Sequence, residues 1–112
     1  MITGTEIGTF IGFNWTGTTW QNDTNITGNL GDIGDYSSLT VFEKSGTTYL
    51  IGGNEAGNYY GFNWSGTQWQ VDNNITGGLI FTDYCASPTV FLKDSTYYLI
   101  SSGCSTNFFG YN

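Results

Sequence analysis

The chain has no histidine and no arginine, and two lysines are its only cationic side chains. Without histidine the commonest general base of enzymes is missing, and neither a serine–histidine nor a cysteine–histidine pair can be assembled. Imidazole-bound zinc is excluded as well, and two cysteines are too few for a structural zinc site. The composition therefore predicts a protein that is not an enzyme and that holds no metal ion and no cofactor.

Positive charge is scarce, since two lysines stand against nine acidic residues and the net charge is −7. Nucleic-acid binding needs a cluster of positive charges to neutralise phosphates, which this chain does not have. Anionic membrane surfaces are disfavoured for the same reason. No apolar run reaches the length of a membrane span, and Met1 is not followed by the pattern of a signal peptide. We therefore expect neither nucleic-acid binding nor membrane insertion.

What the chain does contain is an internal repeat. Gly-Phe-Asn-Trp-Thr-Gly-Thr at 12–18 returns as Gly-Phe-Asn-Trp-Ser-Gly-Thr at 61–67, and as Gly-Tyr-Asn at 110–112, with an offset of 49 residues each time. A period of about 40 to 50 residues is typical of β-propellers with one blade per repeat. The chain is thus predicted to be a single propeller segment, 1–112, made of a partial blade, 1–13, and two full repeats, 14–62 and 63–111.

Each repeat has the pattern of four short antiparallel strands, and no segment has helical periodicity. The strands of the central blade are expected at 38–43, 48–52, 58–64 and 68–72, where Thr, Val and aromatic residues are frequent. By this alignment the first blade lacks its first strand and the last blade lacks its fourth. The predicted fold class is all-β, with propeller blades of four antiparallel strands.

Two full repeats are too few for a closed propeller, which usually has about four to eight blades. The chain is therefore expected to be either a protomer that forms a ring or fibre with other copies, or a piece of a longer array. In the first case it is a homo-oligomer whose open blades are covered by a neighbour, because proteins cover or pair exposed sheet edges.

The central repeat reads Ser-Leu-Thr-Val-Phe at 38–42, Tyr-Leu-Ile-Gly-Gly-Asn at 49–54 and Gly-Asn-Tyr-Tyr-Gly-Phe at 57–62. This order of apolar strand, turn, apolar strand, Gly-Asn-x-x-Gly and aromatic strand resembles FG-GAP/VCBS-type propeller repeats. The resemblance implies an extracellular or cell-surface binding module. That family often has a calcium-binding loop in the first turn of the blade. Here Lys44 and Lys93 stand where the carboxylates would converge, so calcium is not expected.

Cys85 and Cys104 both lie in the last repeat, nineteen residues apart, where the preceding repeat has Tyr36 and Glu55. Two cysteines that appear together indicate a bonded pair, and two unrelated thiols are the alternative. Disulfides persist outside the cytosol, so the pair favours an extracellular or cell-surface location. Five Asn-x-Ser/Thr triplets are candidate glycosylation sites: Asn14, Asn22, Asn25, Asn63 and Asn74.

Carboxylates are the only catalytic groups left to consider. Asp32, Asp35 and Glu55 lie in predicted loops, but the next repeat has Phe81 and Tyr84 in place of the two aspartates. An active site built once per repeat would not change in this way, so we interpret these residues as solvated loop acids.

Aromatic side chains are better candidates for function. Trp15 and Trp20 recur one repeat later as Trp64 and Trp69. Exposed indoles can stack on sugar rings, whereas packing between blades would bury about 150–250 Å² of each ring. Loop residues that could bond sugar hydroxyls complete the candidate site: Tyr36, Asn54, Glu55, Asp83 and Tyr84.

Two functions therefore compete. The first is a non-catalytic, lectin-like module that binds glycans as an oligomer, and the second is a structural or adhesive protein that assembles with itself. The exposure of the four tryptophans distinguishes between the two.

Overall fold

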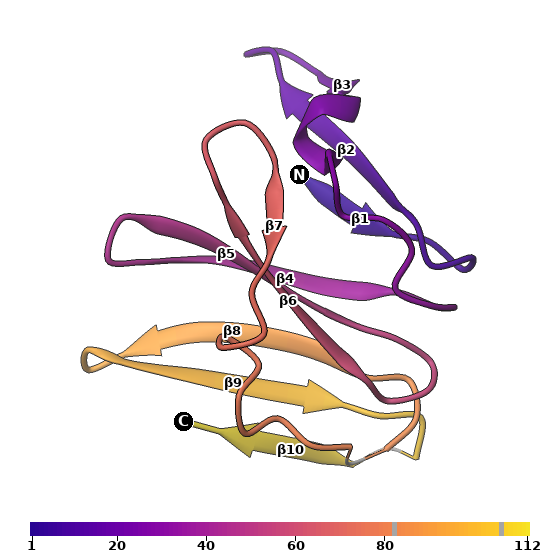
Figure 1. Ribbon diagram of the computed structural model, residues 1–112, viewed down its shortest axis with the longest axis vertical. Helices are drawn as coiled ribbons and strands as arrows, with labels where there is room; N and C mark the ends of the chain where they lie inside the picture. The colour runs from indigo at the N-terminus through magenta and orange to yellow at the C-terminus, as the bar shows by residue number, and fades with distance from the viewer. Residues whose placement is uncertain (82, 106) are drawn as a thin grey trace.

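The computed structural model describes residues 1–81, 83–105 and 107–112, which form three antiparallel sheets (Figure 1). The first sheet contains β1 (Ile2–Gly4), β2 (Phe10–Trp15) and β3 (Trp20–Asn22), and a short 3-10 helix follows, η1 (Thr24–Thr27). The central sheet contains β4 (Ser38–Lys44), β5 (Thr47–Gly53), β6 (Tyr59–Trp64) and β7 (Trp69–Val71). The last sheet contains β8 (Ser87–Lys93), β9 (Thr96–Ser102) and β10 (Phe108–Tyr111).

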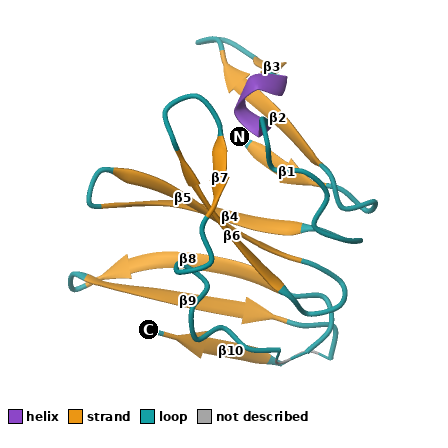
Figure 2. Cartoon of the chain, viewed as in Figure 1, coloured by secondary structure: helices purple, strands orange, loops and turns teal. Residues whose placement is uncertain are grey.

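The all-β class is confirmed, and strands and loops make up almost all of the described chain (Figure 2). The central sheet has the four strands of a full blade, and the first and last sheets have three strands each, as expected from a missing first strand and a missing fourth strand. The three sheets are arranged as an open fan and not as a closed propeller (Figure 1). The physical reason is that a ring needs a neighbour on both faces of every sheet, and a row of three sheets leaves two faces open.

Tight turns set the register of the first hairpin of each repeat. Ser45 and Gly46 connect β4 to β5 with φ values of 52° and 78°, and Lys44 pairs with Thr47 across this turn. Two successive residues with positive φ form the two-residue turn that suits the right-handed twist of a hairpin. Strands β8 and β9 are joined in the same way, although no glycine is present in that turn.

The three sheets meet along their first strands, and β4 contacts β1 on one side and β8 on the other (Figure 1). The hydroxyls of Ser38 and Ser87, which are equivalent residues in successive repeats, lie 3.0 Å apart. The backbone N–H of Val90 donates to the Thr40 hydroxyl at 3.2 Å. Equivalent strands of successive repeats therefore lie side by side in the structure.

The largest core lies between the first and central sheets. The loop that follows η1 contributes apolar side chains from one side, and β5, β6 and β7 contribute from the other: Leu30, Ile33, Leu50, Phe62 and Trp69. Four half-buried side chains pack around this cluster: Ile2, Phe10, Leu39 and Trp64. The loop after the outer strand of one sheet thus covers the next sheet.

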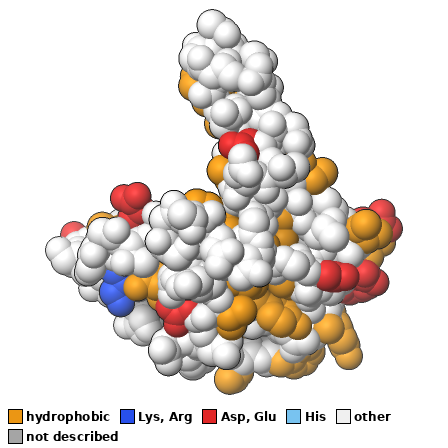
Figure 3. Space-filling model, turned by 45° about the horizontal axis from the view of Figure 1, so that its top comes forward, with side chains coloured by type: hydrophobic (Ala, Val, Ile, Leu, Met, Phe, Trp, Pro, Cys, Tyr) orange, Lys and Arg blue, Asp and Glu red, His pale blue; other side chains and the backbone are white. Residues whose placement is uncertain are grey.

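The surface is mostly uncharged. On the face drawn in Figure 3, the acidic side chains and a small cationic area are scattered among polar atoms and apolar patches. This agrees with a composition in which only 10% of residues are charged.

Candidate functional site: the tryptophan pairs and the loop edge

Trp64 and Trp69 lie opposite each other at the end of the β6–β7 pair, with ring centroids 5.2 Å apart and planes inclined at 66°. Trp69 is only 3% exposed. Its indole Nε1 donates to the Ile26 carbonyl at 2.8 Å, and its backbone N–H donates to the Gly28 carbonyl at 3.1 Å. The Asn29 side chain in turn donates to the Trp69 carbonyl at 2.9 Å. The loop of the first sheet thus holds Trp69 by three hydrogen bonds.

Trp15 and Trp20 form the equivalent pair at the end of β2 and β3. Their ring centroids are 5.4 Å apart and the planes are inclined at 58°, close to the geometry of the later pair. Their exposure is very different, at 55% for Trp15 and 49% for Trp20. Among the described residues, neither indole N–H has a hydrogen-bond acceptor. In the part of the chain that the structure describes, no loop of another sheet covers this pair as the loop at 26–29 covers Trp69.

A cavity of about 190 Å³ lies between the central and last sheets, and we call it the inter-sheet cavity. It is lined by the loop after β7 and by strands of both sheets, including Phe42, Ile75, Leu79, Leu99 and Tyr111. None of these lining residues was among the candidate site residues predicted from the sequence.

The repeat alignment explains where the cavity lies. Leu79, Leu99 and Tyr111 stand one period after Leu30, Leu50 and Phe62, which surround Trp69 in the larger core. The residue equivalent to Trp69 would come from a strand beside β10, and the described part of the last sheet has no such strand. The inter-sheet cavity therefore occupies the position that the Trp69 indole has in the preceding repeat. The same alignment is the signal from which the cavity could have been found.

The other predicted ligand residues lie at the opposite end of the strands, where turns and connecting loops meet. We call this side the loop edge, defined by Glu6, Tyr36, Glu55, Tyr84 and Cys104. Backbone hydrogen bonds of 2.8–2.9 Å join the loops of successive sheets: Tyr36 N–H to Glu6, Glu55 N–H to Asp35, Cys85 N–H to Glu55 and Cys104 N–H to Tyr84. The structure thus brings four predicted residues, Tyr36, Glu55, Asp83 and Tyr84, to one edge and places the tryptophans elsewhere.

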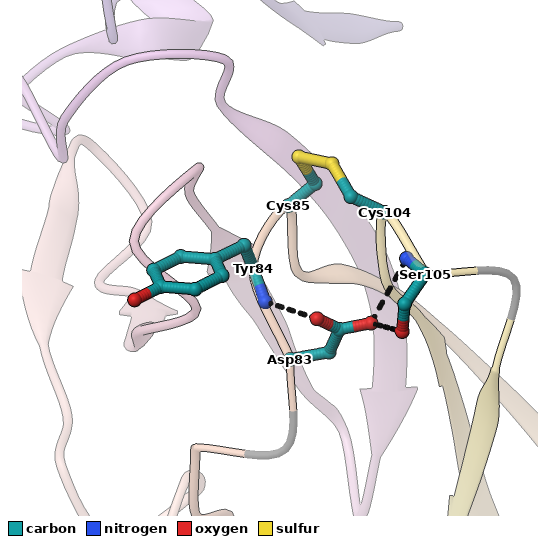
Figure 4. The surroundings of a disulfide bond; sticks show 5 residues. All are labelled: Asp83, Tyr84, Cys85, Cys104 and Ser105. Carbon is teal, nitrogen blue, oxygen red and sulfur yellow. Dashed lines mark hydrogen bonds between the residues drawn. A yellow bond between two sulfur atoms is a disulfide. The ribbon is translucent and has the colours of Figure 1, made fainter.

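The predicted disulfide between Cys85 and Cys104 is confirmed, with Cα atoms 5.3 Å apart (Figure 4). Asp83 lies beside it and accepts hydrogen bonds from the Ser105 hydroxyl, from the Ser105 backbone N–H at 3.0 Å and from the Tyr84 backbone N–H at 2.8 Å. These hydrogen bonds, that of the Ser105 hydroxyl above all, lower the pKa of the Asp83 carboxyl below its usual 3.8.

Tyr36 is exposed at the loop edge, and its hydroxyl donates to Glu6 Oε1 at 2.9 Å. This hydrogen bond and the negative charge of Glu6 raise the pKa of the Tyr36 phenol above 10.0, and desolvation and the charges of Glu55 and Asp35 add to the effect. The loop edge is therefore acidic around Tyr36.

Asn54 is 4% exposed, and both ends of its amide are used within the fold. Its Nδ2 donates to the Ile33 carbonyl at 2.8 Å, and its Oδ1 accepts from the Asn58 backbone N–H at 3.0 Å. Asn54 joins the loop of one sheet to the turn of the next, and its buried amide is not accessible to a ligand.

Four of the five candidate glycosylation sites are exposed: Asn14, Asn22, Asn25 and Asn74. The fifth, Asn63, is half-buried and donates to the Asp72 carboxylate at 3.1 Å. The described residues contain no group of three or more metal-ligating side chains close enough to share an ion. They also contain no helix with the length and apolarity that a membrane crossing requires.

No protein-family model, no characterised protein and no solved structure matches this chain.

Proposed function

We propose that this chain is a non-catalytic, β-propeller-type module that acts outside the cytosol by binding further copies of itself through its two open end faces. The observation that carries the proposal is the contrast between the two tryptophan pairs. Trp69 is 3% exposed beneath the loop of the first sheet, whereas Trp20 is 49% exposed at the equivalent position. Contiguous exposed apolar surface is typical of interaction sites. The Trp15–Trp20 pair therefore forms one binding face.

The outer face of the last sheet supplies the other half of the contact. Phe91, Ile100 and Phe108 are 40%, 42% and 75% exposed there. Ile100 stands two repeats after Ile2, and Phe108 stands two repeats after Phe10. Both earlier residues pack against the larger core. Two different apolar faces at opposite ends favour head-to-tail contacts, which close into a ring or extend into a filament according to the rotation between copies.

Location and class rest on separate observations. The Cys85–Cys104 disulfide supports a place outside the cytosol, where such bonds persist. The likeness to FG-GAP/VCBS-type repeats supports a propeller-type, extracellular or cell-surface module. The absence of histidine and arginine from the sequence supports a role without catalysis and without nucleic-acid partners.

Light scattering coupled to size-exclusion chromatography tests the proposal. We expect the mean mass to rise over about a hundredfold increase in protein concentration, since association follows mass action. The double variant Trp15→Ala/Trp20→Ala should keep the mass of one chain over the same range. Val71→Ala is the matched control, because Val71 is 67% exposed but lies in β7 of the central sheet, which belongs to neither end face. A wild-type mass of one chain at every concentration would refute self-association.

A carbohydrate ligand is the second candidate, and the exposed Trp15–Trp20 pair is the observation that favours it. Two indoles inclined at 58° with Asn14 and Gln21 on the neighbouring positions can stack on a sugar ring and bond its hydroxyls. A glycan-array screen followed by titration separates the two functions. Glycan binding at millimolar concentration that is lost in Trp20→Ala, and that does not depend on self-association of the chain, would show that the Trp15–Trp20 pair is a carbohydrate site.

A further inference from the structure

Strands β2 and β10 are equivalent strands of different sheets. Their sequences, Phe-Ile-Gly-Phe-Asn at 10–14 and Phe-Phe-Gly-Tyr-Asn at 108–112, differ at two of five positions. Their registers also agree, since Gly12 pairs with Ile2 and Gly110 pairs with Ile100, each two repeats apart. The two strands differ on the edge that faces away from β1 and β9. On that edge β2 pairs with β3, whereas β10 is the last strand of its sheet among the described residues.

The loop beside β10 already has the conformation that receives a tryptophan in the preceding repeat. Gly77 N–H donates to the Asn74 carbonyl at 3.1 Å, as Gly28 N–H donates to Asn25 at 3.2 Å. Ile75 and Gly77 thus occupy the places of Ile26 and Gly28, whose carbonyls accept from Trp69. The inter-sheet cavity next to them is open at the position of the indole.

The face of β10 that points away from the central sheet is also uncovered. A Cβ atom at Gly12 would lie 2.5 Å from Ile26 Cγ1, because the loop after β3 packs directly on this glycine. The loop after β7 packs in the same way on Gly61 through Ile75. At Gly110 a Cβ atom would have no neighbour within 4 Å. The place for a loop like that of η1 is therefore open on the last sheet.

We propose that copies of this chain exchange strands, so that β10 of one copy replaces β2 of the next copy beside β3. The result is a four-stranded sheet, β8-β9-β10 of one copy with β3 of the other. Trp20 of the second copy enters the inter-sheet cavity, and Ile26 packs on Gly110. This inference rests on the proposed self-association and names the segments that carry it.

The exchange replaces two of the three pairs of β3 by equivalent pairs, and it exchanges the exposed Trp15–Trp20 pair for a buried Trp20 indole. The pairs that β3 makes with Phe13 and Asn14 are replaced by pairs with Tyr111 and Asn112. Ile100 of β9 and Phe108 of β10 take the places that Ile2 and Phe10 have in the core of the second copy before the exchange. The added terms are the first strand, β8, which the first sheet lacks, and the burial of the Trp20 indole. Burial of such an aromatic ring is among the largest favourable terms available to a single side chain.

Chemical cross-linking of the full chain tests the exchange. Asn14 pairs with Gln21 within the first sheet, so after exchange Asn112 of another copy stands opposite Gln21. A Gln21→Cys/Asn112→Cys variant treated with a short bismaleimide should give a ladder of linked copies. The two native cysteines are bonded to each other and do not react. Each single variant should lose the ladder.

The matched control, Asn14→Cys/Gln21→Cys, is linked within one chain by the same reagent. The link prevents β3 from leaving β2, so we expect loss of the concentration-dependent rise in mass. A locked variant that still associates would overturn the exchange. Oligomers of the Gln21→Cys/Asn112→Cys variant without a ladder would also overturn it, yet would leave the proposed self-association intact.

A second measurement needs no introduced cysteine. Trp20 moves from a half-exposed to a buried site in the exchange, whereas Trp15 loses its partner strand and stays exposed. The tryptophan emission should therefore shift to shorter wavelength as concentration rises, in Trp15→Phe as in the wild type, and the shift should be lost in Trp20→Phe. Equal shifts in both variants would overturn the exchange in favour of simple stacking of the end faces. A chain that stays single throughout would refute both proposals.

Discussion

Trp20 and Trp69 are the same residue at the same position of the repeat, and they differ only in what covers them. Trp69 has three hydrogen bonds to the loop at 26–29, while Trp20 has no acceptor for its indole among the described residues. Buried polar groups need partners, so the Ile26 carbonyl and the Trp69 indole depend on each other. We therefore expect the two tryptophans to contribute differently to the free energy of unfolding of the monomer.

We expect Trp69→Phe to lower the free energy of unfolding by about 2 kcal/mol. The Ile26 carbonyl would lose its donor, and the smaller ring would leave a cavity in the core. Urea denaturation at low protein concentration measures the change. The matched Trp20→Phe variant should lose less than about 0.5 kcal/mol, as is usual for surface substitutions. Equal losses in both variants would show that the loop contact adds nothing to stability.

The carboxylate of Asp83 links folding to pH. Its pKa in the folded chain lies below 3.8, chiefly because the Ser105 hydroxyl donates to it. A lowered folded pKa gives a stabilisation that is present above the unfolded pKa and is lost as the pH falls through the folded pKa.

Asp83→Asn should therefore be less stable than the wild type at neutral pH, and the difference should shrink as the pH falls below about 4. Chemical denaturation over a pH series measures it. Ser105→Ala removes the main hydrogen bond and should reproduce most of the effect. A difference that stays constant down to acid pH would contradict the assigned cause.

At the scale of elements, the loops between sheets organise the molecule as much as the strands do. The segments after β3 and β7 fold back on Gly12 and Gly61 and carry the apolar side chains that fill the next interface. At the loop edge, backbone hydrogen bonds link each such loop to the turns of neighbouring sheets. The disulfide strengthens this link only at the last sheet, where Tyr36 and Glu55 are replaced by Cys85 and Cys104.

Replacing both cysteines by serine should lower the free energy of unfolding by about 3 kcal/mol, the loop-entropy value for a closed segment of this length. Denaturation of the wild type with and without a reducing agent provides an independent measurement. The reducing agent should have no effect on the double variant. A wild-type unfolding curve that does not respond to reduction would contradict a stabilising disulfide.

At the scale of the whole molecule, charge opposes the association that the apolar end faces favour. Each copy carries a net charge of −7, so copies repel one another at low ionic strength. The contacts proposed here are apolar and are not weakened by salt.

Raising the salt concentration from about 0.02 M to about 0.2 M should therefore strengthen self-association, because a shorter Debye length screens the repulsion between the copies. Sedimentation or light scattering over a concentration series measures the shift. An interface held by ion pairs would respond in the opposite direction.

The all-β class, the strands of the central sheet to within one residue at each end, and the pairing of Cys85 with Cys104 could all be predicted from the sequence. These features follow from local pattern and from the repeat, since alternation, turn residues and a fixed offset are all readable along the chain. Tertiary structure alone decided that Trp69 is buried while Trp20 is exposed, that Asn54 is used inside the fold, and that a cavity lies beside β10. Each of these depends on which sheet lies next to which. Identical residues in successive repeats receive different neighbours at the middle and at the ends of an open fan, and burial follows the neighbours.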